Sequence, residues 1–398
     1  MSRERPSSRP PAPRNPGRAP ARGAGHPARA ALAALALAFA LLPAGCRSRS
    51  PALIGLAGPL RDPAGAPMRR AAELAVDEIN AGGGVGGRPL ALVERDDFGN
   101  PDSATAVAAA FYRSRVSAVV GHLFASQSAA ASAVYGAGPR PLVAISPSSC
   151  GPEAGRLGPS TFRLCPSEAT QGAALAQWAR RRSFQRGAVL YLNDEYGRAV
   201  RQGFVQEFER LGGELVAIDP YLDADPEVGP YLDRLAARPG AQFLLVAGRR
   251  TDAERILREV RRRGVTVPVL GSRGLEGIEQ AGPVAEGVYL SQPYLPSLGS
   301  AANRRFVEAY RRRYPTAEPP NQTAAATYDA VRLLAAAIAR AGTDRAAVRR
   351  ALREIGTATP PFEGATGKVW FDPTGGLHAA QVSVAVVRGG VLRPADEP

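Results

Sequence analysis

From residue 52 onward, short apolar runs alternate with amphipathic helical stretches, and Gly or Pro separates most of them. The first run, Ala52-Leu-Ile-Gly-Leu-Ala57, predicts a buried strand. The stretch 66–80 places its small and apolar residues, Met68 and Ile79 among them, on one helical face, and Ala81-Gly82 predicts its end. Repetition of this unit is typical of a parallel sheet covered by helices.

The alternation forms two series, separated by a loop at 146–165. The first series predicts strands at 52–57, 89–94, 118–121 and 141–145, with helices at 66–80, 102–115 and 127–136. The second predicts strands at 187–192, 214–218, 242–246, 267–271 and 287–290, with helices at 169–182, 196–211, 228–237, 252–263 and near 275–281. Helices at 303–314, 321–341 and 345–355 and β segments at 367–371 and 381–387 follow. Two doubly wound α/β lobes are therefore expected, with a ligand site at the carboxyl ends of their strands.

The first 45 residues differ in composition from the rest. Residues 1–29 are rich in Arg, Pro and Gly, and the apolar run 30–42 follows them. This order is typical of an export signal peptide, since a membrane-spanning helix needs about 20 apolar residues. Leu42-Pro-Ala-Gly-Cys46 resembles the bacterial lipobox, which implies lipid attachment to Cys46. Leu42 stands one place further from the Cys than usual, and an ordinary secretory signal is the alternative.

Charge and length narrow the function further. The chain carries 50 Lys and Arg against 36 Asp and Glu, a formal net charge of +14. The leader holds seven Arg and one Glu, so the charge of the remaining 353 residues falls to +8. These residues show no basic cluster with a reading motif, which argues against nucleic-acid binding. Their length suits two domains of about 150 residues each.

Motifs for catalysis are missing. Gly82-Gly-Gly-Val-Gly-Gly87 has the spacing of a dinucleotide loop, but it follows a helix and precedes a strand, the reverse of the order that brings helix amides to a phosphate. No Gly-x-Ser-x-Gly occurs, and only His122 and His378 follow the leader. The adjacent Asp96 and Asp97 point to opposite sides of a strand end. No catalytic residue, cofactor or enzyme activity is therefore expected, and the scattered His and Cys exclude a metal site.

Cys150 and Cys165 are the only cysteines besides Cys46. They lie at the end of the first series of strands and enclose a short loop. Outside the cytoplasm such a pair can form a disulfide, and two buried thiols are the alternative.

Several segments, in order, resemble the leucine/isoleucine/valine-binding family of ABC-transporter substrate-binding proteins. They are Ile54–Pro59, 72–80, 83–88, Asp96–Pro101, Val120–Leu123, Ile145–Ser148, Phe162–Glu168 with Gln171-Gly172, and Asp194–Gly197. The resemblance covers essentially the whole chain after the leader. It implies the type I periplasmic binding protein fold, in which two lobes joined by a three-stranded hinge close on a solute.

The resemblance also implies lobe boundaries. Lobe 1 is expected to comprise 51–166 with 293–366, and lobe 2 to comprise 167–292 with 367–392. The hinge segments are expected near 165–168, 291–294 and 364–368.

In that family a Ser after the third strand and groups after the Ser-Pro of the fourth strand hold the solute's α-carboxylate. The resemblance carries these places to Ala125 with Ser126, and to Ser148, Ser149 and Cys150. Ala125 stands in the usual Ser place and Cys150 in a usual Thr place. The hydrogen bonds to the solute's carboxylate are therefore expected to come from Ser126 and Ser149 instead. The alternative for these hydroxyls is helix capping in a loop.

The far lobe of the family offers an aromatic side chain and an acidic residue that takes the solute's ammonium. Tyr196 matches the aromatic place, Arg249 replaces an aromatic residue, and Arg273 stands in the acidic place. Arg273 would repel an ammonium, whereas two Arg would favour an anionic solute such as an organic acid. Solvent-exposed positions for Arg249 and Arg273 are the alternative.

An amino acid remains the expected solute if another carboxylate replaces the lost one. The candidates are Asp194, Glu195, Asp252 and Glu276.

The sequence thus predicts a solute-binding lipoprotein of an ABC importer, on the periplasmic or extracellular face of the cell membrane. Its expected partners are a small solute, either an amino acid or an organic acid, a permease complex, and the membrane through a lipid anchor. A sensory receptor that passes occupancy to a signalling partner is the alternative, because a fold by itself proves no function.

Overall fold

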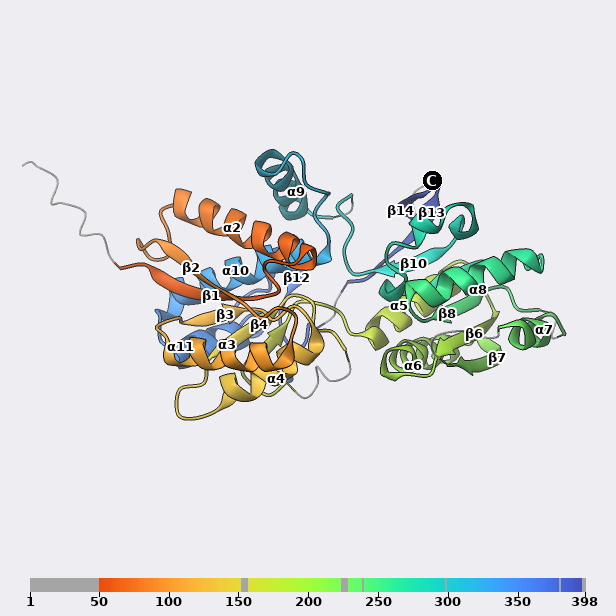
Figure 1. The fold of residues 1–398 in the computed structure, drawn as a ribbon, viewed down its shortest axis with the longest axis horizontal. Helices are drawn as coiled ribbons and strands as arrows, with labels where there is room; N and C mark the ends of the chain where they lie inside the picture. Colours follow the sequence, from red (N-terminus) through yellow and green to blue (C-terminus); the bar gives the residue numbers. More distant parts are fainter. Residues whose placement is uncertain are drawn as a thin grey trace, which may run out of the picture. The chain divides into compact units, whose positions relative to one another are not determined.

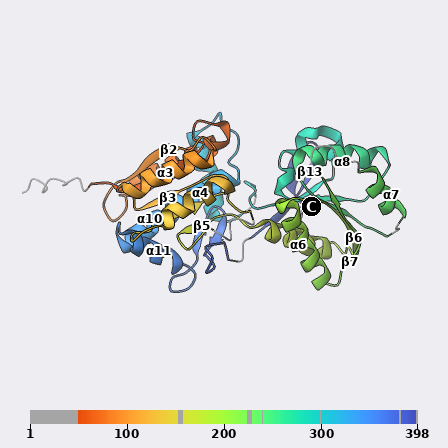
Figure 2. The ribbon, with the colours of Figure 1, turned by 60° about the horizontal axis from the view of Figure 1, so that its bottom comes forward.

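A computed structural model describes residues 50–151, 157–222, 228–237, 240–297, 299–378 and 381–395. The expected signal peptide and Cys46 lie outside these residues. Ser50–Pro398 form one unit, which contains two separate large sheets, each covered by helices (Figures 1 and 2).

The first sheet has five parallel strands in the order β2-β1-β3-β4-β5. Its strands are β1 (Ala52–Gly58), β2 (Leu90–Asp96), β3 (Ala118–Val120), β4 (Val143–Ser146) and β5 (Thr161–Arg163). The helices η1 (Pro63–Gly65), α2 (Ala66–Ala81), α3 (Pro101–Arg113) and α4 (Ala125–Gly136) connect them. Later in the chain, α9 (Ala301–Arg313), α10 (Gln322–Ala341), α11 (Arg345–Arg353) and the hairpin of β11 (Phe362–Gly364) and β12 (Gly367–Val369) follow.

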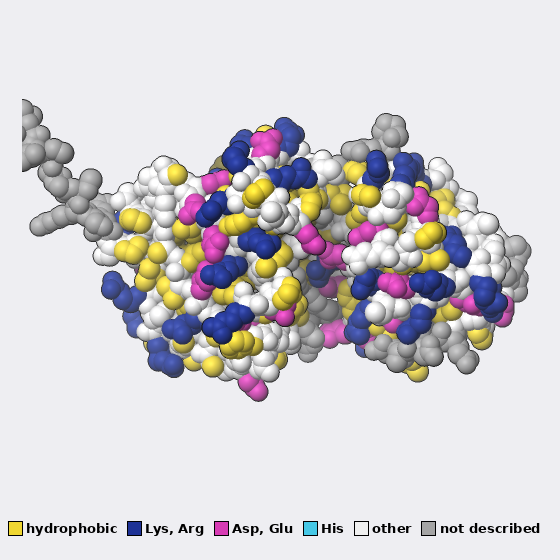
Figure 3. Space-filling view, turned by 45° about the horizontal axis from the view of Figure 1, so that its top comes forward, with side chains coloured by type: hydrophobic (Ala, Val, Ile, Leu, Met, Phe, Trp, Pro, Cys, Tyr) yellow, Lys and Arg dark blue, Asp and Glu magenta, His cyan; other side chains and the backbone are white. Residues whose placement is uncertain are grey.

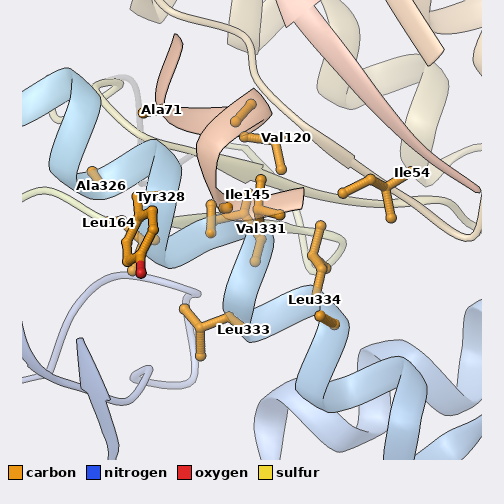
Figure 4. Packing of buried hydrophobic residues seen from close by; sticks show 14 of the residues in the cluster. Ile54, Ala71, Val120, Ile145, Leu164, Ala326, Tyr328, Val331, Leu333 and Leu334 are labelled. Carbon is orange, nitrogen blue, oxygen red and sulfur yellow. The ribbon is translucent and has the colours of Figure 1, made fainter. Parts of the chain in front are cut away.

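Alternating side chains of this sheet enter two cores. Ile54 and Leu56 of β1 join the cluster that α2 and α10 cover, whereas Ala57 joins the cluster under α3 and α4. Because successive strand residues point to opposite faces, a run that is apolar throughout is buried on both sides. Figure 4 shows Val331 and Leu334 of α10 packed against the first of these faces.

The second sheet has seven strands in the order β14-β13-β10-β9-β8-β6-β7. Its strands are β6 (Arg186–Leu192), β7 (Glu214–Tyr221), β8 (Leu244–Ala247), β9 (Val269–Gly271), β10 (Tyr289–Gln292), β13 (Ser383–Arg388) and β14 (Val391–Pro394). Strand β13 pairs antiparallel with β10 and with β14, whereas the other strand pairs described for this sheet are parallel. Its helices are α5 (Glu168–Arg181), α6 (Glu195–Arg210), α7 (Gly229–Ala237), α8 (Arg250–Arg262), η3 (Arg273–Leu275) and η4 (Ile278–Ala285).

Helices α5 and α6 approach each other closely because glycines stand where they meet. A Cβ at Gly172 would lie 2.2 Å from the carbonyl oxygen of Val200, and one at Gly203 would lie 2.0 Å from that of Ala169. Both helices cover one face of the second sheet, and Trp178 and Phe204 belong to the buried cluster there.

The predicted parallel α/β class is confirmed, with most strands and helices at the expected places. Strand β5 lies inside the segment 146–165, which was expected to be a loop, and β14 was not predicted. Both are edge strands of few residues, so they give little apolar periodicity. Among the described helices, none is long and apolar enough to span a membrane.

The third crossing between the sheets lies later than expected. Val369 and Phe371 belong to the same buried cluster as β1 and α10, and Phe371 pairs with Leu377. The segment 364–368 is therefore the turn of the β11–β12 hairpin, and the chain leaves the first sheet between Leu377 and β13. Assigning 367–371 to the second lobe was wrong, because Val369 and Phe371 are buried in the core of the first sheet, where the Phe371 ring packs on Phe162 of β5.

Candidate functional site

A pocket of about 430 Å³ lies at the carboxyl ends of the strands, and residues following strands of both sheets line it. This is the place at which ligands bind in open parallel sheets. The lining residues are Leu123, Phe124, Ala125, Ser148, Cys150, Gly151, Glu168, Asp194, Glu195, Tyr196, Arg249 and Arg273.

The start of α4 forms part of the first side of the pocket. Its N-cap is Phe124, which has no side-chain group to accept from the first-turn amides. Phe124 and Ala125 line the pocket, so the uncapped helix end lies beside it. A helix N-terminus with unsatisfied amides attracts anions. Ser126 lies outside the lining, and its hydroxyl donates to Gln127 Oε1 at 3.0 Å.

Ser149 does not offer its hydroxyl to the pocket. It is fully buried, with its Oγ 2.5 Å from Ser128 Oγ and 2.8 Å from Ser146 Oγ. Its backbone N–H also donates to Ser146 Oγ, at 3.1 Å. The expectation that the Ser149 side chain binds the solute's carboxylate was therefore wrong. Its hydroxyl belongs to a buried cluster and does not line the pocket.

The same cluster joins a buried triad. His122 Nδ1 lies 2.5 Å from Asp97 Oδ2, and its Nε2 lies 3.1 Å from the Tyr135 hydroxyl. The carbonyl of His122 accepts from Ser128 and Ser146. Burial, with a smaller effect from the Asp97 charge, raises the pKa of Tyr135. None of the three triad residues lines the pocket, and their hydrogen bonds join the segments after β2 and β3 to α4.

A disulfide joins Cys150 to Cys165, with a Cα–Cα distance of 5.6 Å. Cys150 lines the pocket, and Cys165 lies in the first crossing between the sheets. The bond therefore ties one side of the pocket to a crossing segment. It also leaves Cys150 no thiol proton with which to replace the hydroxyl of a Thr.

Asp194 and Arg249 face each other on the far side of the pocket. Asp194 Oδ1 accepts from the amide of Gly197 and so caps α6, while its Oδ2 accepts from Arg249 Nη2 at 2.7 Å. Arg249 is half-exposed in this pair. Its charge is therefore balanced before a solute arrives.

Tyr196 is held by two hydrogen bonds. Its hydroxyl lies 2.5 Å from Ser272 Oγ and accepts from the amide of Gly274 at 2.6 Å. Burial raises the pKa of Tyr196, although the two hydrogen bonds and the charge of Arg273 oppose the shift. The ring is therefore a neutral, fixed surface of the pocket.

Three carboxylates and two guanidinium groups line the pocket. Glu168, at the start of α5, is buried, and Glu195 lies in the first turn of α6. The backbone N–H of Arg273 donates to Gln171 Oε1 at 3.3 Å. Besides the Asp194–Arg249 pair, the lining thus contains the side chains of Glu168, Glu195 and Arg273.

Two other candidate carboxylates do not line this pocket. Asp252 is buried, accepts from Tyr221 at 3.5 Å and pairs with Arg255. Glu276 lines another hollow, near Arg61 and Arg250. Of the four acidic residues considered from the sequence, Asp194 and Glu195 reach the pocket.

The pocket unites Ala125, Ser148, Cys150, Tyr196, Arg249 and Arg273, as the resemblance implied, and leaves out Ser126 and Ser149. Sequence reasoning missed Leu123, Phe124, Gly151 and Glu168. Glu168 lies in a segment that carried the resemblance, directly after Ser167, which caps α5. The sequence does not indicate the direction of a side chain at the start of a helix, and only the fold shows that Glu168 faces the pocket. No group of three His, Cys, Asp or Glu that could hold a metal occurs in the described part of the chain.

Sequence comparison shows which known proteins this chain is similar to. Residues 51–390 match the family described as "Periplasmic binding protein". A leucine-, isoleucine-, valine-, threonine- and alanine-binding protein of Pseudomonas aeruginosa is 28% identical over 81% of this chain and 86% of its own length.

Solved structures are similar over almost the whole unit. An ABC transporter substrate-binding protein from Desulfitobacterium hafniense is 30% identical, with a TM-score of 0.76, over 87% of this chain and 100% of that chain. A structure from the same organism in complex with Leu is 28% identical over the same shares, with a TM-score of 0.74.

Proposed function

This chain belongs to the periplasmic binding protein family, and its ABC-transporter relatives are solute-binding proteins and not enzymes. On this basis we propose that its solute is an aliphatic α-amino acid, which it delivers to an ABC permease. The observation that carries the proposal is the charge pattern of the pocket, in which an uncapped helix end and Arg273 lie with Glu168 and Glu195. Groups of both signs suit a zwitterion better than an anion.

The solute carboxylate is expected at the start of α4. The first-turn amides there have no side-chain cap, and the positive end of the helix dipole favours a negative charge. Arg273 adds a guanidinium, which forms charge-assisted hydrogen bonds with carboxylates.

The solute ammonium is expected near Glu168 and Glu195. Carboxylates accept several hydrogen bonds each, so either can take an ammonium proton in addition to its protein contacts. Arg273 stands where the family has an acidic residue, and that substitution had favoured an anionic solute. Glu168 and Glu195 supply the missing negative charge from other positions.

An aliphatic side chain fits the apolar part of the lining. Leu123, Phe124 and the Tyr196 ring supply apolar surface there. The binding of Leu by the relative from Desulfitobacterium hafniense supports the same assignment.

Calorimetric titration with leucine and two analogues tests the proposal. The analogues are 4-methylpentanoate, which lacks the ammonium, and 3-methylbutylamine, which lacks the carboxylate. Leucine should bind, and each analogue should bind at least about tenfold more weakly, because each loses charge-assisted hydrogen bonds worth about 1.5–3 kcal/mol apiece. A thermal-shift panel gives an independent signal, since a ligand at 100 times its Kd stabilises by about 2.7 kcal/mol.

Tighter binding of an anion than of leucine would reverse the assignment of the solute. If 4-methylpentanoate or benzoate bound more tightly than leucine, Arg249 and Arg273 would be selecting an anion. If leucine, 4-methylpentanoate and benzoate all failed to bind, the results would argue against both an aliphatic amino acid and a simple organic acid as the solute.

Family membership implies an extracytoplasmic location, and we infer that Cys46 carries a lipid anchor there. Metabolic labelling with a fatty acid should tag the wild-type protein, and Cys46→Ser should release it unlabelled from membranes. A labelled Cys46→Ser protein would exclude this cysteine as the acylation site. Stable anchoring needs two acyl chains, since one chain binds membranes only marginally.

A further inference from the structure

A second hollow, of about 530 Å³, lies at the edge of the first sheet opposite the solute pocket. The end of α3, the segments before β3 and β4, and the start of α11 line it. Ser117 N donates to Leu53 O at 2.9 Å, and Ile54 pairs with Ala118. The hollow therefore lies beside the start of β1, and Figure 1 shows β1 beginning at the end of the sheet where α11 lies.

The hollow is strongly basic. Arg113, Arg115 and Arg140 are exposed in it, and Arg345 is partly buried. Among its lining residues the only acid is Asp344, which caps α11 by accepting from the amide of Ala347. Basic side chains occur on other parts of the surface too (Figure 3), but elsewhere many of them pair with Asp or Glu, as Arg210 does with Glu207.

Arg345 is a structural member of this group. Its guanidinium donates to the backbone carbonyls of Phe111, Tyr112, Ser114 and Val116, at 2.9–3.3 Å. Burial lowers the pKa of Arg345, and the nearby charge of Arg140 lowers it further. Arg345 and Arg140 thus lie near each other in the lining of the hollow, and Arg113, Arg115 and Arg140 are exposed to solvent.

The strand order extends this charge along the edge. Parallel strands begin at one edge of a sheet, and Arg88, Arg115 and Arg140 stand in the segments before β2, β3 and β4. Arg88 Nε donates to the carbonyl of Ser50, directly before β1. We call Arg88, Arg113, Arg115 and Arg140 the basic edge.

We propose that the basic edge binds the phosphate groups of anionic phospholipids in the membrane that holds the Cys46 anchor. This inference rests on the anchoring part of the proposed function. Only six residue steps join Cys46 to Ala52, which span at most about 20 Å. The start of β1, and with it the basic edge, therefore stays close to the headgroups, while the solute pocket lies at the other ends of the strands.

The expected gain follows from the charge near an anionic surface. Each Arg near such a surface contributes about 1 kcal/mol, which corresponds to roughly fivefold in the partition constant. Arg113, Arg115 and Arg140 together should contribute on the order of a hundredfold.

The test uses residues 46–398, with one fatty acyl chain coupled to the Cys46 thiol. Residues 50–398 form a unit of their own, and a solved relative of matching extent is covered over its whole length, so we expect this unit to fold without the leader. Coupling is specific because the other two cysteines form the disulfide. A single chain binds reversibly, with a constant of about 10⁴ M⁻¹ for a myristoyl group, which leaves the contribution of the edge measurable.

Binding is measured on vesicles of phosphatidylcholine alone and of phosphatidylcholine with phosphatidylglycerol. The unaltered protein should bind the anionic vesicles more tightly, and Arg113→Gln/Arg115→Gln/Arg140→Gln should lose most of that preference. The matched control, Arg258→Gln/Arg305→Gln/Arg312→Gln, removes the same charge from exposed positions on α8 and α9 and should retain it. Thermal unfolding and leucine titration check that both variants are folded.

Three outcomes overturn the proposal: equal binding to the two kinds of vesicle, equal losses in the two triple variants, or displacement by inorganic phosphate at constant ionic strength. The last would indicate a site for soluble phosphate. Because the acyl chain is coupled chemically, failure here is distinct from failure of fatty-acid labelling in cells.

Discussion

Arg273 has a direct bearing on the solute, because it stands where the related family places an acidic residue and it lines the pocket. Its side chain lies with Glu168 and the fixed Tyr196 ring, and the charges of Arg273 and Glu168 act on the pKa of Tyr196 in opposite directions. In the proposed function, Arg273 therefore attracts the carboxylate of the solute.

Arg273→Ala should weaken leucine binding by about ten- to a hundredfold, since one or two charge-assisted hydrogen bonds to the carboxylate are lost. Arg273→Glu should weaken it further by repulsion. Calorimetric titration measures both, with Arg258→Ala, an exposed residue outside the pocket lining, as the control. Unchanged affinity in Arg273→Ala would show that the guanidinium points to solvent.

Gly274 is a second residue on which the pocket depends. A Cβ there would lie 2.4 Å from the carbonyl oxygen of Gly248 and 2.5 Å from the Tyr196 hydroxyl. Gly274→Ala should therefore displace Tyr196, lower the free energy of unfolding by about 1–3 kcal/mol and weaken leucine binding. Gly136→Ala is the control, because a Cβ at Gly136 meets no atom within 4 Å. Similar urea midpoints and affinities for the two variants would contradict this account.

Among the elements, α10 and the β11–β12 hairpin are joined by one buried carboxylate. Asp329 on α10 accepts from the amides of Ala365 and Thr366 and from the Thr366 hydroxyl, at 2.6–2.8 Å. Burial raises the pKa of Asp329 to about 6, although these hydrogen bonds oppose the shift.

A raised pKa gives a defined pH dependence. The folded state holds the Asp329 proton more tightly than the unfolded state, whose Asp pKa is about 3.9. The stabilisation is therefore complete below that pH, and roughly 3 kcal/mol of it is lost as the pH rises to about 6. Chemical unfolding of the wild type and Asp329→Asn across this range should show a difference in unfolding free energy that changes with pH. Parallel profiles would mean that the two states share one Asp329 pKa.

For the whole molecule, residues after strands of both sheets line one pocket, and three segments cross between the sheets. The disulfide ties the first crossing to the pocket, and the third crossing begins after Leu377. These connections suit a hinge that responds to the solute.

Saturating leucine should reduce the radius of gyration in solution scattering, because a solute held from both sides draws the lobes together. The measurement is repeated with 3-methylbutylamine, which should leave the radius unchanged. An unchanged radius with bound leucine would exclude closure as the response to this solute.

The sequence predicted which positions of the chain reach the pocket better than it predicted which side chains point into it. The places of Ala125, Ser148, Cys150, Tyr196, Arg249 and Arg273 came from the resemblance to the leucine/isoleucine/valine-binding family. In the structure they line one pocket, as residues that follow parallel strands meet at one edge. Ser149 was misjudged because a serine that faces a pocket and one that faces a buried hydroxyl cluster differ only in side-chain direction.

The sequence by itself determined the parallel α/β class, the two series of strands and most element bounds, because apolar periodicity and Gly or Pro breaks act over a few residues. The tertiary structure decided which charges oppose each other: Asp194 with Arg249, and Glu168 in the same pocket as Arg273. It also decided that Val369 and Phe371 belong to the core of the first sheet. These outcomes depend on contacts between segments far apart in the chain, whose distances no local pattern encodes.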